Sequence, residues 1–273
     1  MSKPAWPYAS RTDLRTKIDR SGRECIRLVA IAAPFLLFPP SAFSAWDFVP
    51  TPIEYQSWPE YCRVQFTTTE SVGLTMPGVV RYSNATVEEW RGIIGEPQYS
   101  GLHHYCASIH FLNRSRVERD PRQRSFVLQR ALDDAVFSYS RADPKSSVYP
   151  SMSVTLAQIK MDMQKPEEAE EILRAAIESQ PQRPEAYMML ALVHRKQKKL
   201  DQARDDLQRA DAATGGESPE IQYNLGLLNL ELGDVDAAVA NAKKAYAAGY
   251  PLPGLQRKLV QLGRWPKEES SVR

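Results

Sequence analysis

The sequence has 273 residues, of which 42% are hydrophobic and 25% are charged, an ordinary composition for a globular protein of one or two domains. Its formal net charge of +2 at pH 7 is too small to indicate nucleic-acid binding. What the protein does must therefore be sought in particular segments.

Residues 1–45 have the pattern of a secretory signal peptide. Seven Lys or Arg and three acidic residues within 1–27 precede an apolar run, residues 28–38, and the small residues at 41–45. The apolar run is too short to span a bilayer. An uncleaved N-terminal anchor, which would hold the protein near a membrane, is the alternative. Cleavage would change the net charge from +2 to −2 and leave an exported protein, periplasmic in a bacterium or else extracellular.

Export would place the two remaining cysteines in an oxidising compartment. Cys62 and Cys106 are then expected to form a disulfide, which would close a loop of about 44 residues. Two buried free thiols are the alternative.

Residues 46–97 are expected to be an irregular, aromatic-rich segment. Thr51 and Pro52 predict a helix that runs to about Phe66, followed by a loop over residues 67–83. Thr86 with Glu89 predicts a capping box for a short helix. The aromatic side chains of this segment either cover one end of a helical array or form a binding surface; they are Trp46, Phe48, Tyr55, Trp58, Tyr61 and Phe66.

Residues 98–149 predict a divergent pair of long helices. The second helix is marked by apolar residues between Phe126 and Phe137 and ends near Asp143. The first helix is marked by an apolar stripe at helical spacing, which consists of Leu102, Tyr105, Cys106, Ile109 and Leu112.

The first of these helices also carries residues that can bind metals. His103, Cys106 and His110 fall at positions i, i+3 and i+7, a spacing that suits zinc or copper. A disulfide would remove the Cys106 thiolate, and packing on the N-terminal segment is the simpler interpretation. The sequence contains no nucleophile elbow, phosphate loop or Cys-x-x-Cys pair. We therefore predict no catalytic residue, no metal site, no cofactor and no enzymatic activity.

Residues 150–265 contain a repeat with a period of 34 to 35 residues. Four columns keep the same register, and they consist of Pro150, Pro184 and Pro219; Leu156, Leu190 and Leu225; Ala169, Ala203 and Ala238; and Ala176, Ala210 and Ala245. Each segment has the pattern of two amphipathic helices, and small alanines let paired helices approach closely. The sequence predicts three helix pairs, a capping helix over residues 252–262 and a tail over residues 266–273.

The period and the residue types resemble the tetratricopeptide repeat (TPR). Leu190-Ala191 and Leu225-Gly226 match the family pattern in the first helix of a repeat, and Gly233 matches its turn. Lys198 departs from that pattern because it replaces the turn glycine of the second repeat. With the flanking segments, the expected fold is all-α, a TPR-like α-solenoid of antiparallel helix pairs with an irregular N-terminal helical segment and a C-terminal capping helix.

The resemblance also implies a binding groove, because in this family the first helix of each repeat lines a concave surface. Carried over by repeat position, its partner-binding residues would be Met161, Met188, Leu192, Arg195, Lys196, Tyr223, Leu227 and Leu230. Their apolar centre suits an amphipathic helix or an apolar peptide segment. The alternative is that some of them bury against the capping helix. The family's clamp for acidic C-terminal tails is not matched, because Met188 and Leu192 stand where the clamp needs polar groups.

Three functions from different classes follow. The first is an exported adaptor or scaffold that mediates protein–protein interaction, in the assembly of a cell-envelope complex and without nucleic acid. The second is a self-associating structural subunit of an envelope or extracellular assembly. The third is a metal-handling or redox protein that uses Cys62, Cys106 and the nearby histidines.

Overall fold

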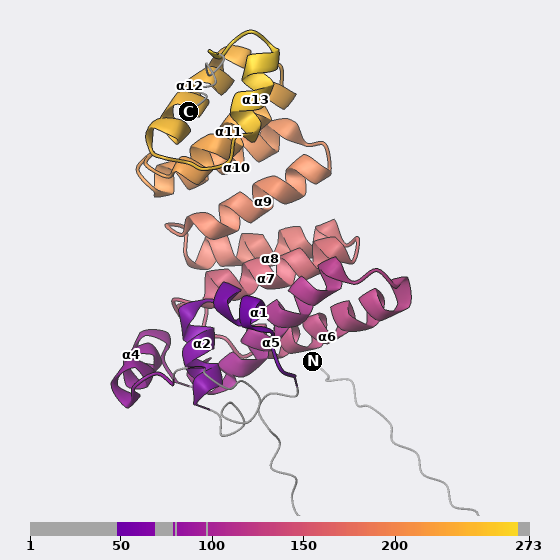
Figure 1. Ribbon diagram of the computed structural model, residues 1–273, viewed down its shortest axis with the longest axis vertical. Coiled ribbons are helices and arrows are strands. Elements are labelled where there is room, and N and C mark those ends of the chain that lie inside the picture. The colour runs from indigo at the N-terminus through magenta and orange to yellow at the C-terminus, as the bar shows by residue number, and fades with distance from the viewer. Residues whose placement is uncertain (1–47, 69–78, 80, 97, 267–273) are drawn as a thin grey trace, which may run out of the picture. The chain divides into compact units, whose positions relative to one another are not determined.

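The computed structural model describes residues 48–68, 79, 81–96 and 98–266. The predicted signal peptide, Trp46, most of the predicted loop over residues 67–83 and all but the first residue of the predicted tail lie outside these ranges. All described residues belong to one compact unit, Phe43–Arg273. Within the described part of the chain the structure contains helices and no strands (Figure 1).

The segment before the long helices contains two short helices where the sequence predicted one. Helix α1 covers Pro52–Ser57 and helix α2 covers Glu60–Thr67. The interruption lies at Pro59, which has no N–H to donate and which favours an extended conformation at Trp58, where φ is −73° and ψ is 151°. The predicted helix from Pro52 to Phe66 is therefore divided by its own proline.

Helix α4, Asn84–Ile94, begins earlier than predicted. The hydroxyl of Ser83 accepts a hydrogen bond from the Thr86 N–H at 3.1 Å, so Ser83 is the N-cap and Thr86 lies inside the first turn. The capping box predicted at Thr86 and Glu89 is thus wrong. A reciprocal capping box is found instead at the start of α1, between Thr51 and Glu54.

Helices α5, Gln98–Val117, and α6, Pro121–Tyr139, form the predicted long pair. Leu102 and Cys106 are buried on α5, and Ala131 and Ala135 are buried on α6. Phe126, which the sequence assigned to the apolar face of the second helix, is instead 61% exposed. The buried stripe of α6 follows its small residues because they allow α5 to approach.

Three further helix pairs follow, and each pairs with its neighbour in the sequence: α7 with α8, α9 with α10 and α11 with α12 (Figure 1). The first helix of a pair also packs on the pair before it, as α9 does on α7 and α8. The bounds are α7 Tyr149–Asp162, α8 Pro166–Ser179, α9 Pro184–Lys196, α10 Leu200–Ala213, α11 Pro219–Glu231 and α12 Val235–Ala247.

The repeated alanines lie where paired helices meet. Ala169, Ala203 and Ala238 are completely buried. The alanines seven residues later in the same three helices, Ala176, Ala210 and Ala245, are at most 1% exposed. A larger side chain at these positions would push the paired helices apart and leave neighbouring apolar groups without contacts. The period of the sequence therefore corresponds to a period of close helix contacts.

The turn inside each repeat uses one left-handed residue. These residues are Gln164, Lys198 and Gly233, with φ values of 62°, 64° and 81°. The next residue along the chain donates its N–H to a carbonyl five positions earlier, as Lys199 does to His194 at 2.9 Å. This is the Schellman pattern, which supplies partners for the last carbonyls of a helix.

Helix α13, Gly254–Gln261, covers the end of the array. Leu255 and Leu259 are fully buried against α11 and α12. Gly226 makes this possible, because a Cβ at that position would stand 2.4 Å from a methyl carbon of Leu255. The structure thus confirms the predicted fold class, an all-α solenoid of helix pairs with a C-terminal capping helix. In the described ranges, no helix has the length and apolar character needed to cross a membrane.

Candidate protein-binding groove

The first helices of the three repeats, α7, α9 and α11, share one cavity of about 270 Å³. Helix α9 contributes half of the lining residues, α11 contributes three, and α7 and α10 contribute one each, Gln158 and Leu207. The lining residues are Gln158, Met188, Met189, Ala191, Leu192, Arg195, Leu207, Glu220, Asn224 and Leu228. We call these residues the groove.

The groove has an apolar floor and a polar rim. Met189, Leu207 and Leu228 are buried, while Met188 and Leu192 are partly exposed and available for contact. Polar side chains stand at the edges, and Asn224 donates its amide N–H to the Glu220 carbonyl on its own helix at 3.0 Å. That bond fixes the side chain and leaves its amide oxygen as an acceptor. Such a lining suits an apolar side chain carried on a backbone that can still hydrogen-bond.

Arg195 is already engaged by a carboxylate on the next repeat. Its Nε atom donates to both carboxylate oxygens of Glu231 at 3.0 Å, so the pair bridges α9 and α11. The hydrogen bond with Glu231 raises the pKa of Arg195, and the same bond lowers the pKa of Glu231. Both side chains are 38% exposed, so the pair contributes little to stability. The pair orders the edge of the groove, and Glu231 offsets the positive charge of Arg195.

Two of the predicted groove residues belong to the core instead. Met161 is only 8% exposed, because Met189 and Leu190 of α9 pack in the same cluster. Tyr223 is only 7% exposed, and its ring lies 4.5 Å from that of Tyr250 in the cluster that α13 completes. The assignment of both to a partner-contacting surface is therefore corrected, since helices from later in the chain cover them.

The remaining predicted residues separate into different places. Met188, Leu192 and Arg195 lie together in the groove. Leu227 and Leu230 instead line a second cavity of about 260 Å³ between α11 and the end of α13, with Glu231, Lys258, Gln261 and Leu262. Lys196 is exposed and lines neither cavity.

Sequence reasoning missed several groove residues. Met189, Ala191, Leu207 and Leu228 were not predicted to line the groove, although Met188, Met189 and Leu192 follow one another at helical spacing. That spacing marks a contiguous stripe, but the stripe alone does not say which members face the core and which face the cavity. Leu207 lies on a second helix, for which the repeat pattern gives no expectation of groove contact.

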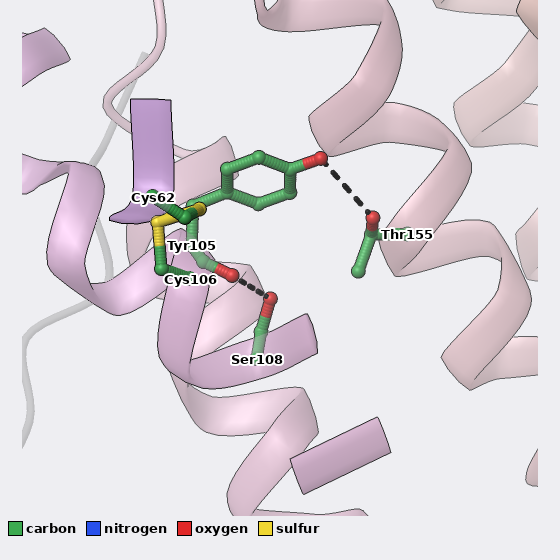
Figure 2. Close-up of a disulfide and its surroundings, with 5 residues drawn as sticks. All are labelled: Cys62, Tyr105, Cys106, Ser108 and Thr155. Atoms are coloured by element: carbon green, nitrogen blue, oxygen red, sulfur yellow. Dashed lines mark hydrogen bonds between the residues drawn. A yellow bond between two sulfur atoms is a disulfide. The ribbon is translucent and has the colours of Figure 1, made fainter. Parts of the chain in front are cut away.

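The structure joins Cys62 of α2 to Cys106 of α5 by a disulfide, with 5.6 Å between the Cα atoms (Figure 2). Both cysteines are fully buried among aromatic side chains. Tyr105 beside them reaches α7, where its hydroxyl oxygen accepts a hydrogen bond from Thr155 at 3.4 Å (Figure 2). The disulfide therefore ties the N-terminal segment to the helix pair on which the array begins.

The histidines near Cys106 have different hydrogen-bond partners, although the ring centres of His103 and His104 lie 4.3 Å apart. His104 bonds to Asp134 of α6 through Nδ1 at 2.6 Å, and the His103 Nδ1 lies 3.1 Å from the carbonyl of Ser100. The buried His110 ring stacks on Phe48 with 3.9 Å between ring centres. Among the described residues, no three His, Cys, Asp or Glu side chains gather as metal ligands would.

The segment that forms the groove matches a known family. A family model of the tetratricopeptide repeat matches residues 154–219, and a second one matches residues 219–248. Residues 154–248 are tetratricopeptide repeats. The two TPR matches meet at the first residue of α11, and together they include every residue that lines the groove, from Gln158 to Leu228. These repeats make the array a scaffold for protein–protein interaction.

Several solved structures align with part of this chain. TTC0263, a thermophilic TPR protein of Thermus thermophilus, is 18% identical, with a TM-score of 0.46 over 64% of this chain and 85% of that one. A crystal structure of MamA is 20% identical, with a TM-score of 0.42 over 54% of this chain and 88% of that one. MamA from Desulfovibrio magneticus is 16% identical, with a TM-score of 0.42 over 73% and 97% of the two chains. No curated protein sequence matches the chain.

Proposed function

We propose that the protein is an exported adaptor that holds an apolar segment of a partner protein in the groove, in the assembly of a cell-envelope complex. One observation carries the proposal: side chains from three consecutive first helices, α7, α9 and α11, line a single cavity. A surface shared by three repeats can select a partner by its length as well as by its side chains.

The lining indicates the chemistry of the partner. Partly exposed Met188 and Leu192 would contact apolar side chains, and methionine adapts its shape to varied ones. Asn224 and Gln158 at the rim offer amide groups to a partner backbone. An acidic tail would need a positive charge in the groove, and the positive charge of Arg195 is already paired with Glu231.

Two features of the sequence support export. Residues 1–45 have the composition of a signal peptide, and the two cysteines that remain after its removal are the two that lie together between α2 and α5. A periplasmic location follows for a bacterial protein. Cell fractionation with N-terminal sequencing of the mature chain tests this, and an uncleaved cytoplasmic chain would refute it.

Groove binding is tested by capture of partners on the full chain from an envelope extract. A photo-crosslinking amino acid at Met188 should yield a discrete adduct, whereas one at Gln208, exposed on α10, should not. Leu192→Glu should reduce recovery of that partner at least about tenfold, because a charge would be buried in an apolar cavity. Val117→Glu places the same charge at a 78% exposed apolar position at the end of α5, away from the groove, and is the control. Equal recovery by both variants would place the partner elsewhere.

Self-association is the second candidate, and the C-terminal end favours it. Leu252 and Leu262 on either side of α13 are 51% and 55% exposed, and Leu262 lines the second cavity. Light scattering of the full chain over a range of concentrations tests this candidate. A dimer that Leu262→Glu dissociates and Leu192→Glu leaves intact would support self-association, and a concentration-independent monomer would exclude it.

A further inference from the structure

A larger cavity lies away from the groove, on the helix pair that precedes the repeats. It has a volume of about 460 Å³ and is lined by the first turns of α5, by the end of α6 and the residues just after it, and by one residue of α7. Its principal lining residues are Gly101, His103, Phe137, Arg141, Ala142 and Met152. We call it the α5–α6 pocket.

A glycine inside α5 opens this pocket. Gly101 is the fourth residue of the 20-residue helix α5, a position where alanine would be the better helix former. Packing does not require it, since a Cβ built at Gly101 would have no atom within 4 Å. The left-handed backbone that often explains a glycine is also absent here, because Gly101 is not among the described positive-φ residues. Gly101 therefore lines the pocket without a side chain that would occupy it.

A cation stands at the rim of the same pocket. The Arg141 guanidinium lies 3.8 Å from the centre of the Phe137 ring, and its Nη1 donates to the Phe137 carbonyl at 3.2 Å. These contacts hold the side chain over an apolar wall. Within the described part of the chain no carboxylate forms an ion pair with Arg141, and its Nη1 also donates to the Ser140 hydroxyl at 3.4 Å. Its charge is thus positioned and not neutralised.

We propose that the α5–α6 pocket binds a small apolar monoanion, a medium-chain or aryl carboxylic acid. The apolar body would lie along Ala142 and Met152, beside Gly101. The carboxylate would accept hydrogen bonds from Arg141, whose planar guanidinium matches two carboxylate oxygens. The volume lies within the range of small-molecule sites and exceeds what one peptide side chain needs.

Calorimetric titration of the full chain with decanoate, below its micelle concentration, tests the proposal. Decanoate should bind at one site, and 1-decanol, which has the same alkyl chain without the charge, should bind about tenfold more weakly. Arg141→Gln should weaken decanoate about tenfold and leave 1-decanol unchanged. Gly101→Leu should abolish binding of both, since its side chain would occupy the pocket. Gly101→Ala adds only a methyl group and is the matched control that keeps binding.

The variants are expected to fold, because open space surrounds Gly101 and leucine favours helix; circular dichroism and thermal unfolding verify this. Leu192→Glu, in the groove, should bind decanoate as the wild type does. The pocket and the adaptor function are therefore tested independently of one another. Undetectable decanoate binding by the wild type, or equal binding by Gly101→Leu and Gly101→Ala, would overturn the proposal.

Discussion

At the scale of single residues, Glu54 links the N-terminal segment to the helix pair behind it. Its carboxylate accepts a hydrogen bond from Arg114 Nε of α5 at 2.9 Å and another from the Thr51 N–H at 2.7 Å. Burial by itself raises the pKa of Glu54, but the bonds from Arg114 and Thr51 and the charge of His110 together lower it to about 2. Ionised Glu54 is therefore stabilised in the folded state.

This shift predicts how stability depends on pH. Because the folded-state pKa lies below the ordinary value of 4.5, the contribution is complete above pH 4.5 and is lost as pH falls toward 2. We expect a loss of roughly 2 kcal/mol over that interval, after allowance for partial exposure. Urea unfolding at several pH values should show a smaller loss for Glu54→Gln than for the wild type. Glu178→Gln, at an exposed carboxylate of α8, should keep the wild-type slope; equal slopes for all three proteins would contradict the assignment.

At the scale of helices, equivalent positions of two repeats carry a buried polar link between paired helices. His194 Nδ1 bonds to Asp206 at 2.6 Å in the second repeat, and Asn229 donates to Asn241 at 2.9 Å in the third. The two links are 35 residues apart at both ends. Buried polar groups need partners, so each link fixes how its two helices face one another.

The turns between paired helices give a prediction at the same scale. Lys198 holds a left-handed conformation that its third-repeat equivalent, Gly233, adopts without strain. Lys198→Gly should therefore stabilise the protein by about 0.5–1 kcal/mol. This is the net of two terms: relief of strain stabilises the folded state, and the greater entropy that glycine gives the unfolded chain offsets part of that gain. Gly233→Ala should destabilise it by about 1 kcal/mol. Chemical denaturation measures both changes, and a less stable Lys198→Gly variant would show that the turn is unstrained.

At the scale of the whole described unit, the disulfide joins segments that are far apart in sequence. Cys62 and Cys106 are separated by 44 residues. In the chain-entropy model, closing a loop of that length raises the free energy of unfolding by about 4 kcal/mol. Besides the bond of Glu54 with Arg114, the N-terminal segment rests on α5 through ring contacts, such as those of Phe48 with His110 and of Tyr61 with Tyr105.

Removal of both cysteines should therefore loosen this segment without disturbing the repeats. We expect Cys62→Ala with Cys106→Ala to lower the free energy of unfolding by about 2–4 kcal/mol and to expose residues 48–68 to proteolysis first. Partner capture through the groove should be unchanged, because the groove is formed by α7 to α11. Limited proteolysis with mass spectrometry checks the order of cleavage. Earlier cleavage in the repeats would show that the disulfide supports the whole array.

The sequence by itself determined the helix pairs, their register and the capping helix, because alanine contacts and turn positions recur at a fixed spacing and act between neighbours in the chain. It did not determine which first-helix residues remain accessible. Tyr223 and Met161 resemble groove residues by spacing, yet α13 and α9 bury them. Nor did it reveal the α5–α6 pocket, where Gly101 and Phe137 come from different helices. Exposure and cavities depend on how several helices meet, and only the tertiary structure decides that.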